Sequence, residues 1–198
     1  MTCRALDIVV GTLMLILLLP LIALIAVAIK LDSPGPIFFR QRRVGRRQEP
    51  FLIAKFRTMH HGTDHAVHRD HVLRLIQDNG PAPKLQTDVR VTRLGQLLRR
   101  LSLDELPQLW NVLRGEMSLV GPRPPIPYEV SEYPPHWCRR FVVKPGITGL
   151  WQVSGRSQVS IEEMIRMDVE YAERRTARLN LWILIRTVPA VLSTKGAG

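Results

Sequence analysis

The amino-acid sequence predicts a mainly α-helical protein with little β-structure, in which a membrane-embedded N-terminal helix precedes a compact cytosolic domain. Residues 8–29 contain no charged side chain and form a run long enough to cross the hydrocarbon core of a bilayer. Apolar residues recur at helical spacing in residues 92–101 and 161–176. Extended backbone is favoured only in the short pieces 37–40 and 50–58.

Length, charge and cysteine content limit the class of protein. The 198 residues suffice for one domain and an anchor, which we place at residues 32–198 and 1–31. The formal net charge of +11 attracts polyanions, which include acidic lipid headgroups, diphosphate substrates and nucleic acid. Cys3 and Cys138 form no CxxC motif, so the sequence indicates neither a zinc site nor a disulfide framework.

Pro20 lies near the middle of the apolar run, and because proline removes a backbone donor we expect a kink there. A kinked helix can span the bilayer, or enter and return through one leaflet. A buried helix of a soluble protein is the alternative. The basic residues that flank the run on its far side are Lys30, Arg40, Arg42, Arg43, Arg46 and Arg47. The positive-inside rule places this flank, and the domain that follows, on the cytoplasmic side.

The later elements follow from periodicity and from proline and glycine positions. In chain order we expect a turn at 33–36, helices at about 66–77, 92–101, 104–113 and 161–176, a loop at 80–87, an irregular proline-rich segment at 122–135 and an apolar segment at 179–192. The last segment is either an amphipathic helix lying at the membrane interface or a core helix of the domain.

Asp104 and Glu105 are adjacent carboxylates at the start of the helix expected at 104–113. In a structural interpretation, Ser102 and Glu105 form a capping box, or Asp104 itself caps the helix. In a functional interpretation, both carboxylates meet one ligand beyond the helix end, where exposed N–H groups favour a phosphate. A hard divalent ion such as Mg²⁺ would then bind carboxylate and phosphate oxygens together.

Several short motifs in fixed order resemble the bacterial sugar transferases, also called monotopic phosphoglycosyl transferases, over nearly the whole chain. This family moves a sugar phosphate from a nucleotide sugar to a polyprenyl phosphate. The motifs are Ser33-Pro34-Gly35-Pro36 with Phe38-Phe39, Gln41-Arg42-Arg43-Val44-Gly45, Lys55-Phe56-Arg57-Thr58-Met59, residues 102–124, residues 144–150 with Gln152 and Gly155-Arg156, and Asp168 with Tyr171. Together they favour the functional interpretation of the carboxylate pair.

The resemblance implies a mechanism of two displacements. Asp104 would attack the sugar-side phosphorus of a UDP-sugar, release UMP and form a phosphosugar–aspartyl intermediate, which polyprenyl phosphate then attacks. Glu105 would hold Mg²⁺ together with Asp104, and Lys55 would be a catalytic cation beside them. The substrate-binding residues that the resemblance implies are Arg99, Pro122, Arg123, Pro124, Gln152, Arg156 and Asp168. It also implies a re-entrant N-terminal helix, although Leu19 precedes Pro20 where family members often carry serine.

The first hypothesis is therefore an enzyme at the cytoplasmic face of the bacterial inner membrane that starts a surface glycan such as exopolysaccharide or O-antigen. Its expected partners are a UDP-sugar, first UDP-glucose or UDP-galactose, polyprenyl (undecaprenyl) phosphate and membrane lipid. Nucleic acid is not expected, and a homo-oligomer is left open. The alternatives are the same reaction with an N-acetylated amino-sugar donor, and a non-catalytic basic membrane protein that binds acidic lipid or nucleic acid.

Overall fold

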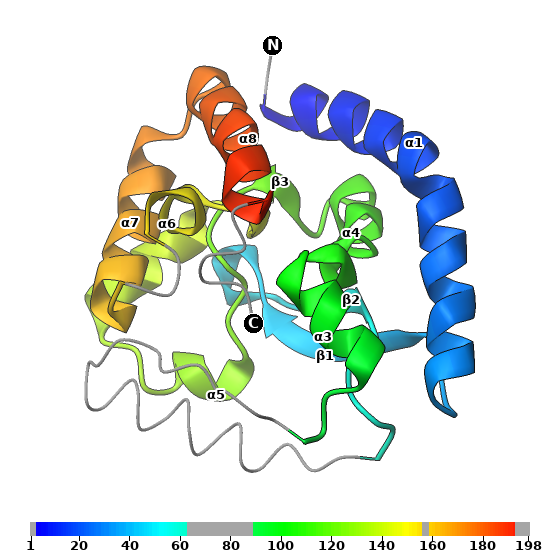
Figure 1. Cartoon of the computed structure of the whole chain (residues 1–198). Helices are drawn as coiled ribbons and strands as arrows, with labels where there is room; N and C mark the ends of the chain where they lie inside the picture. Colours follow the sequence, from blue (N-terminus) through cyan, green and yellow to red (C-terminus); the bar gives the residue numbers. More distant parts are fainter. Residues whose placement is uncertain (1–2, 63–88, 156–158, 193–198) are drawn as a thin grey trace.

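The computed structural model describes residues 3–62, 89–155 and 159–192 of the chain (Figure 1). Within these residues the fold is mainly helical with little β-structure, as predicted, and the strands form two sheets of two strands each. The helices are α1 Cys3–Asp32, α3 Arg93–Arg100, α4 Gln108–Arg114, α5 Pro127–Val130, α6 Leu150–Ser154, α7 Ile161–Arg174 and α8 Ala177–Leu192. The 3₁₀ segments are η1 Arg46–Gln48, η2 Leu103–Glu105 and η3 Pro135–Val142. The helix predicted at 66–77 and the loop predicted at 80–87 lie outside the described residues.

The first sheet is an antiparallel hairpin of β1 Phe38–Val44 and β2 Pro50–Phe56. The first strand is longer than the extended piece predicted at 37–40, because its pairing with β2 continues to the hairpin turn. In that turn Arg47 and Gln48 adopt left-handed backbone, with φ of 55° and 63°. Five arginines among residues 40–47 conceal this hairpin from a hydrophobicity pattern.

The second sheet pairs β3 Ser118–Val120 in parallel with β4 Gly146–Thr148. The sequence does not predict it, because strands of three residues are too short to show an alternating pattern. The segment between the two strands contains the short helix α5 inside the stretch predicted as irregular. This crossover brings residues 118–124 beside residues 146–152 and so helps to build the site described below.

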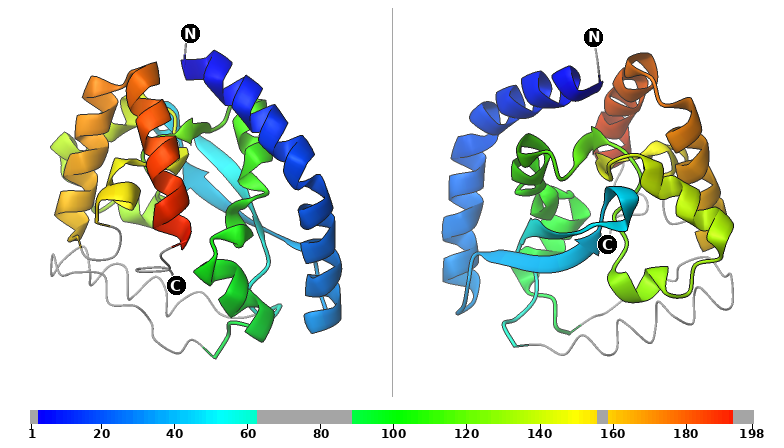
Figure 2. Two further views of the ribbon diagram at one scale, coloured as in Figure 1. Left: turned by 45° about the horizontal axis from the view of Figure 1, so that its top comes forward. Right: turned by 180° about the vertical axis from the view of Figure 1, so that it is seen from behind.

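Helix α1 remains helical through Pro20 for 30 residues, and its ribbon bends along its length (Figures 1 and 2). It is long and apolar enough to cross a membrane, and only 11% of its most apolar 18-residue stretch is buried. Its exposed apolar side chains are Ile8, Val9, Leu13, Ile16, Leu17, Leu19, Leu24, Val27 and Leu31. Such an exposed apolar surface does not fit the alternative of a buried helix in a soluble protein.

The beginning of α1 is tied to the rest of the chain by polar contacts. Arg4 donates from its Nη1 to the Val112 carbonyl in the last turn of α4 at 2.7 Å, and this carbonyl also accepts from the Gly115 N–H. Asp7 is 1% exposed and its carboxylate accepts from the Ser118 hydroxyl at 2.8 Å and from the Leu119 N–H at 2.9 Å. The start of α1 is therefore bound to α4 and β3.

The other end of α1 is held by one arginine. Arg57 follows β2, and its Nη2 donates to the Ser33 carbonyl at 2.6 Å and to the Ile29 carbonyl at 3.2 Å. A small apolar cluster, to which Ile25 and Phe56 belong, packs the same end of α1 against α3. Both ends of the long apolar helix thus contact the same folded body.

Helices α3 and α7 confirm the predictions made from periodicity at 92–101 and 161–176. Each begins at a hydroxyl cap: Thr92 accepts from the Gly95 N–H at 2.9 Å, and Ser160 accepts from the Glu163 N–H at 3.2 Å. The main apolar core joins β2, α4, β3, α7 and α8.

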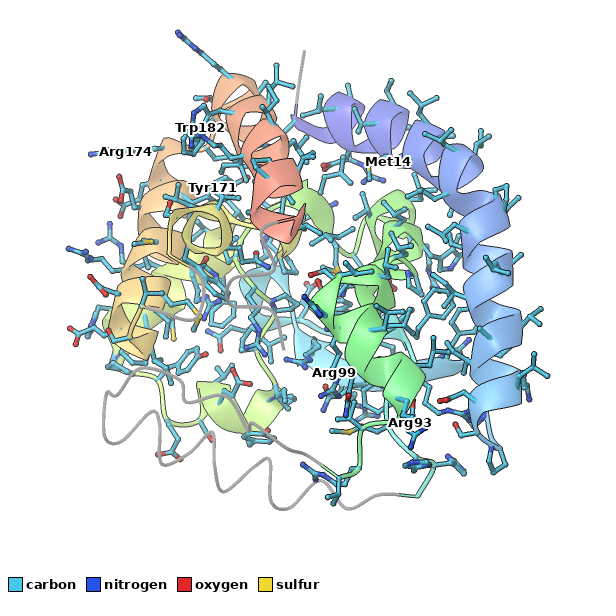
Figure 3. The ribbon with its side chains drawn as sticks, viewed as in Figure 1. Met14, Arg93, Arg99, Tyr171, Arg174 and Trp182 are labelled. Carbon is cyan, nitrogen blue, oxygen red and sulfur yellow. The ribbon has the colours of Figure 1, made fainter. Side chains whose placement is uncertain are left out.

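Helix α8 combines both interpretations of the apolar segment at 179–192. On one face Asn180 and Ile183 are fully buried in the core. On the other face Trp182 is 43% exposed and Ile185 is 64% exposed. Trp182 of α8 and Met14 of α1 lie at the same end of the molecule (Figure 3), so the exposed apolar surfaces of the two helices share that end.

Gly95 allows α3 to pack directly against the chain that follows β2. A Cβ atom at this position would lie 2.1 Å from the Thr58 carbonyl oxygen. We expect Gly95→Ala to lower the free energy of unfolding by about 1–3 kcal/mol, because the clash with backbone outweighs the helix propensity of alanine. A lower Tm of the purified chain in detergent tests this. The control Gln96→Ala changes an exposed neighbour on the same helix, and an equal Tm for both variants would contradict the prediction.

Candidate active site

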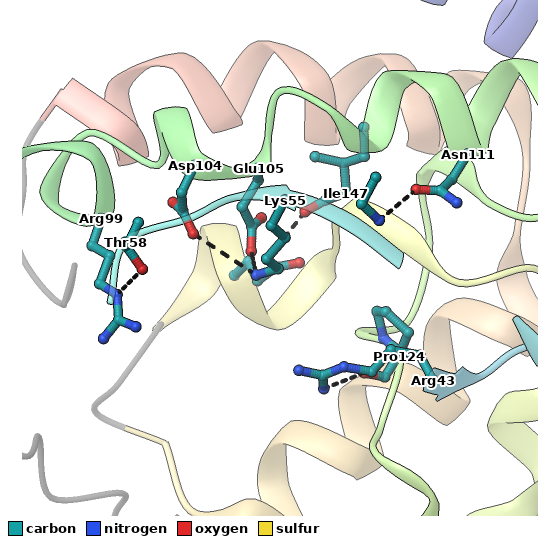
Figure 4. A network of polar contacts seen from close by, with 11 residues as sticks. Arg43, Lys55, Thr58, Arg99, Asp104, Glu105, Asn111, Pro124 and Ile147 are labelled. Carbon is teal, nitrogen blue, oxygen red and sulfur yellow. Dashed lines mark hydrogen bonds and ion pairs between the residues drawn. The ribbon is translucent and has the colours of Figure 1, made fainter. Parts of the chain in front are cut away.

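The motif that begins at Lys55, at the end of β2, contains neighbouring residues with different roles. Lys55 lies at the site, whereas Phe56 is 1% exposed and packs in the core. Arg57 binds the end of α1, as described above. Thr58 accepts a hydrogen bond from Arg99 Nε at 2.9 Å (Figure 4). The alternation of side chains along extended backbone explains why neighbours in this motif point to different partners.

The helix predicted to start at Asp104 starts later. Residues Leu103–Glu105 form a 3₁₀ turn and α4 begins at Gln108. Ser102 has left-handed backbone with φ of 55° and its side chain caps nothing, so the predicted capping box is wrong. The alternative cap is wrong too, because Pro107 occupies the N-cap position of α4 and no side chain bonds there. Neither carboxylate of the pair is used for capping.

Both carboxylates of the pair point toward Lys55 (Figure 4). The Lys55 ammonium lies 2.5 Å from Glu105 Oε1 and 4.0 Å from Asp104 Oδ2. Asn111 joins α4 to β2, because its Oδ1 accepts from the Ala54 N–H at 3.0 Å and its Nδ2 donates to the Leu52 carbonyl at 2.8 Å. The structure therefore brings together the three residues predicted to be catalytic.

The same surroundings act differently on the two carboxyl groups. Burial raises the pKa of Asp104 to about 6, and the neighbouring Glu105 charge adds to this, although Lys55 opposes it. Burial also acts to raise the pKa of Glu105, but Lys55 and Arg123 outweigh it and hold that pKa below its ordinary value. Asp104 is thus a more basic carboxylate than Glu105. The higher basicity of Asp104 suits a nucleophile, and the lowered pKa of Glu105 suits a group that stays ionised beside it.

The Pro122-Arg123-Pro124 segment is fixed from several sides. Arg123 Nη1 lies 3.8 Å from Glu129 Oε2. The Pro122 carbonyl accepts from the Gly146 N–H at 2.9 Å, which joins the segment to β4. The Pro124 carbonyl accepts from Arg43 Nη1 at 3.0 Å (Figure 4). Burial first, and then the nearby charge of Arg123, lower the pKa of Arg43 to about 10.

Asp168 lies deep in the domain rather than on an open surface. It forms an ion pair with Arg140 at 2.5 Å, and both side chains are 1% exposed. Arg140 also donates to the Arg123 carbonyl at 2.6 Å. Asp168 therefore supports the Arg123 segment through Arg140, and burial raises its pKa to about 6 despite that cation.

The two remaining predicted residues have different outcomes. Gln152 stands on α6, and its Nε2 donates to the Ile147 carbonyl at 3.3 Å. Arg156 lies outside the described residues. Sequence reasoning missed Arg43, Asn111 and Arg140 as positioning residues, since their partners lie far away in the chain and no local spacing signals them.

The donor set suits Mg²⁺ better than a metal held by protein alone. Within the described residues no group of three or more histidine, cysteine, aspartate or glutamate side chains could hold a metal ion. Mg²⁺ is usually bound by one or two carboxylates together with substrate phosphates and water. Asp104 and Glu105 supply two carboxylates with cations around them, so the residues present fit that mode of binding.

Comparisons with known proteins show which family the chain resembles over its length. A family model described as bacterial sugar transferase matches residues 1–194. The chain is 40% identical to "Exopolysaccharide production protein ExoY" of Sinorhizobium fredii, covering 98% of this chain and 87% of that protein. It is 43% identical to "UDP-glucose:undecaprenyl-phosphate glucose-1-phosphate transferase" of Caulobacter vibrioides, covering 98% and 71%. It is 41% identical to "UDP-galactose-lipid carrier transferase" of Erwinia amylovora, covering 98% of this chain and 41% of that protein.

Proposed function

Because the chain belongs to the bacterial sugar transferase family, we propose that it transfers a sugar 1-phosphate from UDP-glucose or UDP-galactose to undecaprenyl phosphate and releases UMP. The observation that carries the proposal is the cluster of Asp104, Glu105 and Lys55. In it Asp104, whose pKa is raised, lies beside Glu105, which forms an ion pair with Lys55. Of the relatives named above, the Caulobacter vibrioides protein is named for UDP-glucose and the Erwinia amylovora protein for UDP-galactose.

The first displacement forms a bond between an Asp104 oxygen and the phosphorus next to the sugar. The bond between that phosphorus and the bridging oxygen of the diphosphate breaks, and UMP leaves with the electron pair. In the second displacement a phosphate oxygen of undecaprenyl phosphate bonds to the same phosphorus and the Asp104–phosphorus bond breaks. The carboxylate is regenerated and the product is a polyprenyl-diphosphate sugar, so one difficult transfer is divided into two.

The cations around the site match the charge of the substrates. Asp104 and Glu105 would hold Mg²⁺ together with diphosphate oxygens, and the ion supplies charge neutralisation at the phosphoryl oxygens when it is bound. Lys55 helps to keep Glu105 ionised, and the positive charges of Arg99 and Arg123 act on Asp104 and Glu105 respectively, so both guanidinium groups are near enough for phosphate contacts. Chelation by EDTA is therefore expected to abolish UMP release, and added Mg²⁺ to restore it.

The function is tested with membranes that carry the chain, undecaprenyl phosphate and a panel of UDP-sugars. UDP-glucose or UDP-galactose is expected to release UMP at least about tenfold faster than UDP-N-acetylglucosamine, because a pocket that pairs a hydroxyl discriminates against a bulkier amide. Preference for the N-acetylated donor would select the alternative substrate within the same chemistry. Absence of UMP release with every donor would contradict the proposal, and is what a non-catalytic basic protein predicts.

The contacts of α1 support a helix that enters and leaves the cytoplasmic leaflet. A helix that spans the bilayer would place its ends on opposite sides of a hydrocarbon core about 30 Å thick. Here Arg4 and Asp7 bind α4 and β3, and Arg57 binds the opposite end of α1, so one body holds both ends. The exposed apolar face of α8 would lie at the same interface, where Arg186 stacks over Trp182 at 5.4 Å.

Cysteine labelling tests this topology, because the chain has two cysteines: Cys3 at the start of α1 and Cys138 in the domain that follows. In the Cys138→Ser variant, a membrane-impermeant maleimide is expected to label Cys3 in inverted vesicles and not in intact cells. The Cys3→Ser variant is the matched control, since it reports the side of the membrane on which Cys138 and the domain lie. Labelling of Cys3 from outside while Cys138 is reached only from inside would show a spanning helix.

A further inference from the structure

A cavity of about 430 Å³ lies between α6, the end of α7 and the start of α8. Its apolar walls come from Leu150 of α6, Tyr171 of α7, and Leu179 and Trp182 of α8. The volume falls within the range of small-molecule sites, about 300–1,000 Å³. None of the described residues assigned above to the candidate active site lines this cavity, so the proposed reaction leaves it without a role.

Tyr171 fixes the inner wall of the cavity. Its side chain is 1% exposed, and its hydroxyl donates to the Val120 carbonyl of β3 at 2.9 Å or to Asn180 Oδ1 of α8 at 2.7 Å. Leu150 and Leu179 pack against the same core cluster that contains Tyr171. Core contacts therefore hold the apolar walls in place, as they do in most small-molecule sites.

Arginine side chains supply most of the charge around the cavity. Arg174 and Arg178 line it, and both are exposed. The Arg186 guanidinium lies over the ring of Trp182, which forms one wall, at 5.4 Å. Glu170 also lines the cavity, but its ion pair with Arg174 joins side chains that are 47% and 75% exposed, and such pairs are weak. The cavity is therefore surrounded by more positive than negative charge, which an anionic ligand would offset.

The cavity lies at the end of the molecule that the exposed apolar surfaces of α1 and α8 share. Arg174 of α7 and Trp182 of α8 lie at that end together with Met14 of α1 (Figure 3). Met14 and Leu179 also pack against one core cluster, which joins α1 to the wall of the cavity. Tryptophan and arginine beside exposed apolar side chains are typical of protein surfaces at the level of lipid headgroups. A ligand that reaches the cavity from the membrane is therefore a lipid.

We propose that this cavity binds an anionic phospholipid that is not a substrate, with the lipid phosphate held by Arg174 and Arg178. Leu179 and Trp182 would cover the start of an acyl chain. The inference rests on the interfacial position of α8 proposed above. Guanidinium groups suit a phosphate because they can donate to two of its oxygens at once. A headgroup with net negative charge offsets the arginines, whereas the amine of a zwitterionic headgroup repels them.

Undecaprenyl phosphate is also an anionic lipid, but the proposed reaction requires its phosphate elsewhere. In the second displacement that phosphate attacks the phosphorus held at Asp104, and Asp104 does not line the cavity. A phospholipid bound between α6, α7 and α8 would instead stay in place from one turnover to the next.

Binding is measured as the Tm of the chain purified in detergent and titrated with dioleoylphosphatidylglycerol in mixed micelles. This lipid is expected to raise the wild-type Tm. The same amount of dioleoylphosphatidylcholine, or of soluble glycerol 3-phosphate, is expected to leave it unchanged. In the double variant Arg174→Gln/Arg178→Gln, we expect the concentration of phosphatidylglycerol for half the Tm shift to rise at least about tenfold, because both cations that hold the phosphate are lost.

The matched control is Arg139→Gln/Arg166→Gln, which lowers the net charge equally. These two arginines are 67% and 72% exposed and do not line the cavity, so the control is expected to respond to phosphatidylglycerol as the wild type does. Without lipid, the two double variants are expected to have the same Tm, because each loses only exposed side chains. If Arg174→Gln/Arg178→Gln is less stable than the control, Arg178→Gln alone decides, since Arg178 has no ion pair within the described residues.

Three results would overturn the inference. The first is an equal Tm shift with phosphatidylcholine or glycerol 3-phosphate, and the second is an equal response of the two double variants. The third is a KM for undecaprenyl phosphate that rises tenfold in Arg174→Gln/Arg178→Gln while binding of phosphatidylglycerol is unchanged, which would assign both arginines to the acceptor. Because the Tm shifts require no turnover, a chain that binds phosphatidylglycerol through these arginines but releases no UMP would support this inference and contradict the proposed function.

Discussion

Asp104→Asn is expected to reduce UMP release by at least about 10³-fold, because an amide has no carboxylate oxygen that can attack phosphorus. The variant should remain folded. Asp104 makes no capping bond, and its nearest cation, Lys55, lies 4.0 Å away and is held more closely by Glu105. Since burial disfavours the Asp104 charge, as its raised pKa shows, a neutral isostere is expected to keep or raise the Tm.

The same variant decides whether the transfer passes through a covalent intermediate. Wild-type enzyme incubated with UDP-sugar labelled in the sugar, without undecaprenyl phosphate, is expected to retain label on the protein after denaturation, and Asp104→Asn is not. Glu105→Gln serves as the matched control, because it changes the adjacent carboxyl and leaves the Asp104 oxygens in place. Full activity of Asp104→Asn, or label that stays in it, would assign the nucleophile elsewhere.

The helices that the sequence predicted well have both periodicity and a cap within the segment. Residues 92–101 begin with Thr92 and residues 161–176 follow Ser160, and both hydroxyls cap as their positions indicate. The error at residues 104–113 has a physical reason. Ser102 followed by Glu105 three residues later has the spacing of a capping box, but left-handed backbone at Ser102 turns its side chain away from the helix end.

The candidate site could be predicted only in part for a different reason. The motifs supplied Lys55, Asp104 and Glu105, and the structure places these side chains together. The residues that position them bind across long stretches of chain, as Asn111 binds β2 and Arg140 binds the Arg123 carbonyl. Such contacts depend on how elements pack, and a single sequence carries no local signal of them.

Asp168→Ala is expected to destabilise the protein by about 3–5 kcal/mol, because it leaves the buried Arg140 guanidinium without the oxygen that accepts its hydrogen bond. Arg140 is 1% exposed, as is Asp168, at 2.5 Å from it. In a chain of this size the loss corresponds to a fall in Tm of roughly 10 °C in detergent. Arg140 also donates to the Arg123 carbonyl, so the KM for the UDP-sugar should rise in the surviving fraction.

Asp168→Asn should be far milder, and the contrast identifies the cause. Burial raises the pKa of Asp168 to about 6, so the folded state holds a proton there more tightly than the unfolded chain does, and ionisation of this carboxyl lowers stability as pH rises toward 6. The amide avoids that penalty and still offers an oxygen to Arg140. Glu170→Ala removes an exposed ion pair with Arg174 on the same helix, with side chains 47% and 75% exposed, and is expected to change stability by less than about 1 kcal/mol. Equal losses for Asp168→Ala and Asp168→Asn would show that the negative charge itself, rather than an acceptor for Arg140, stabilises the segment that carries Arg123.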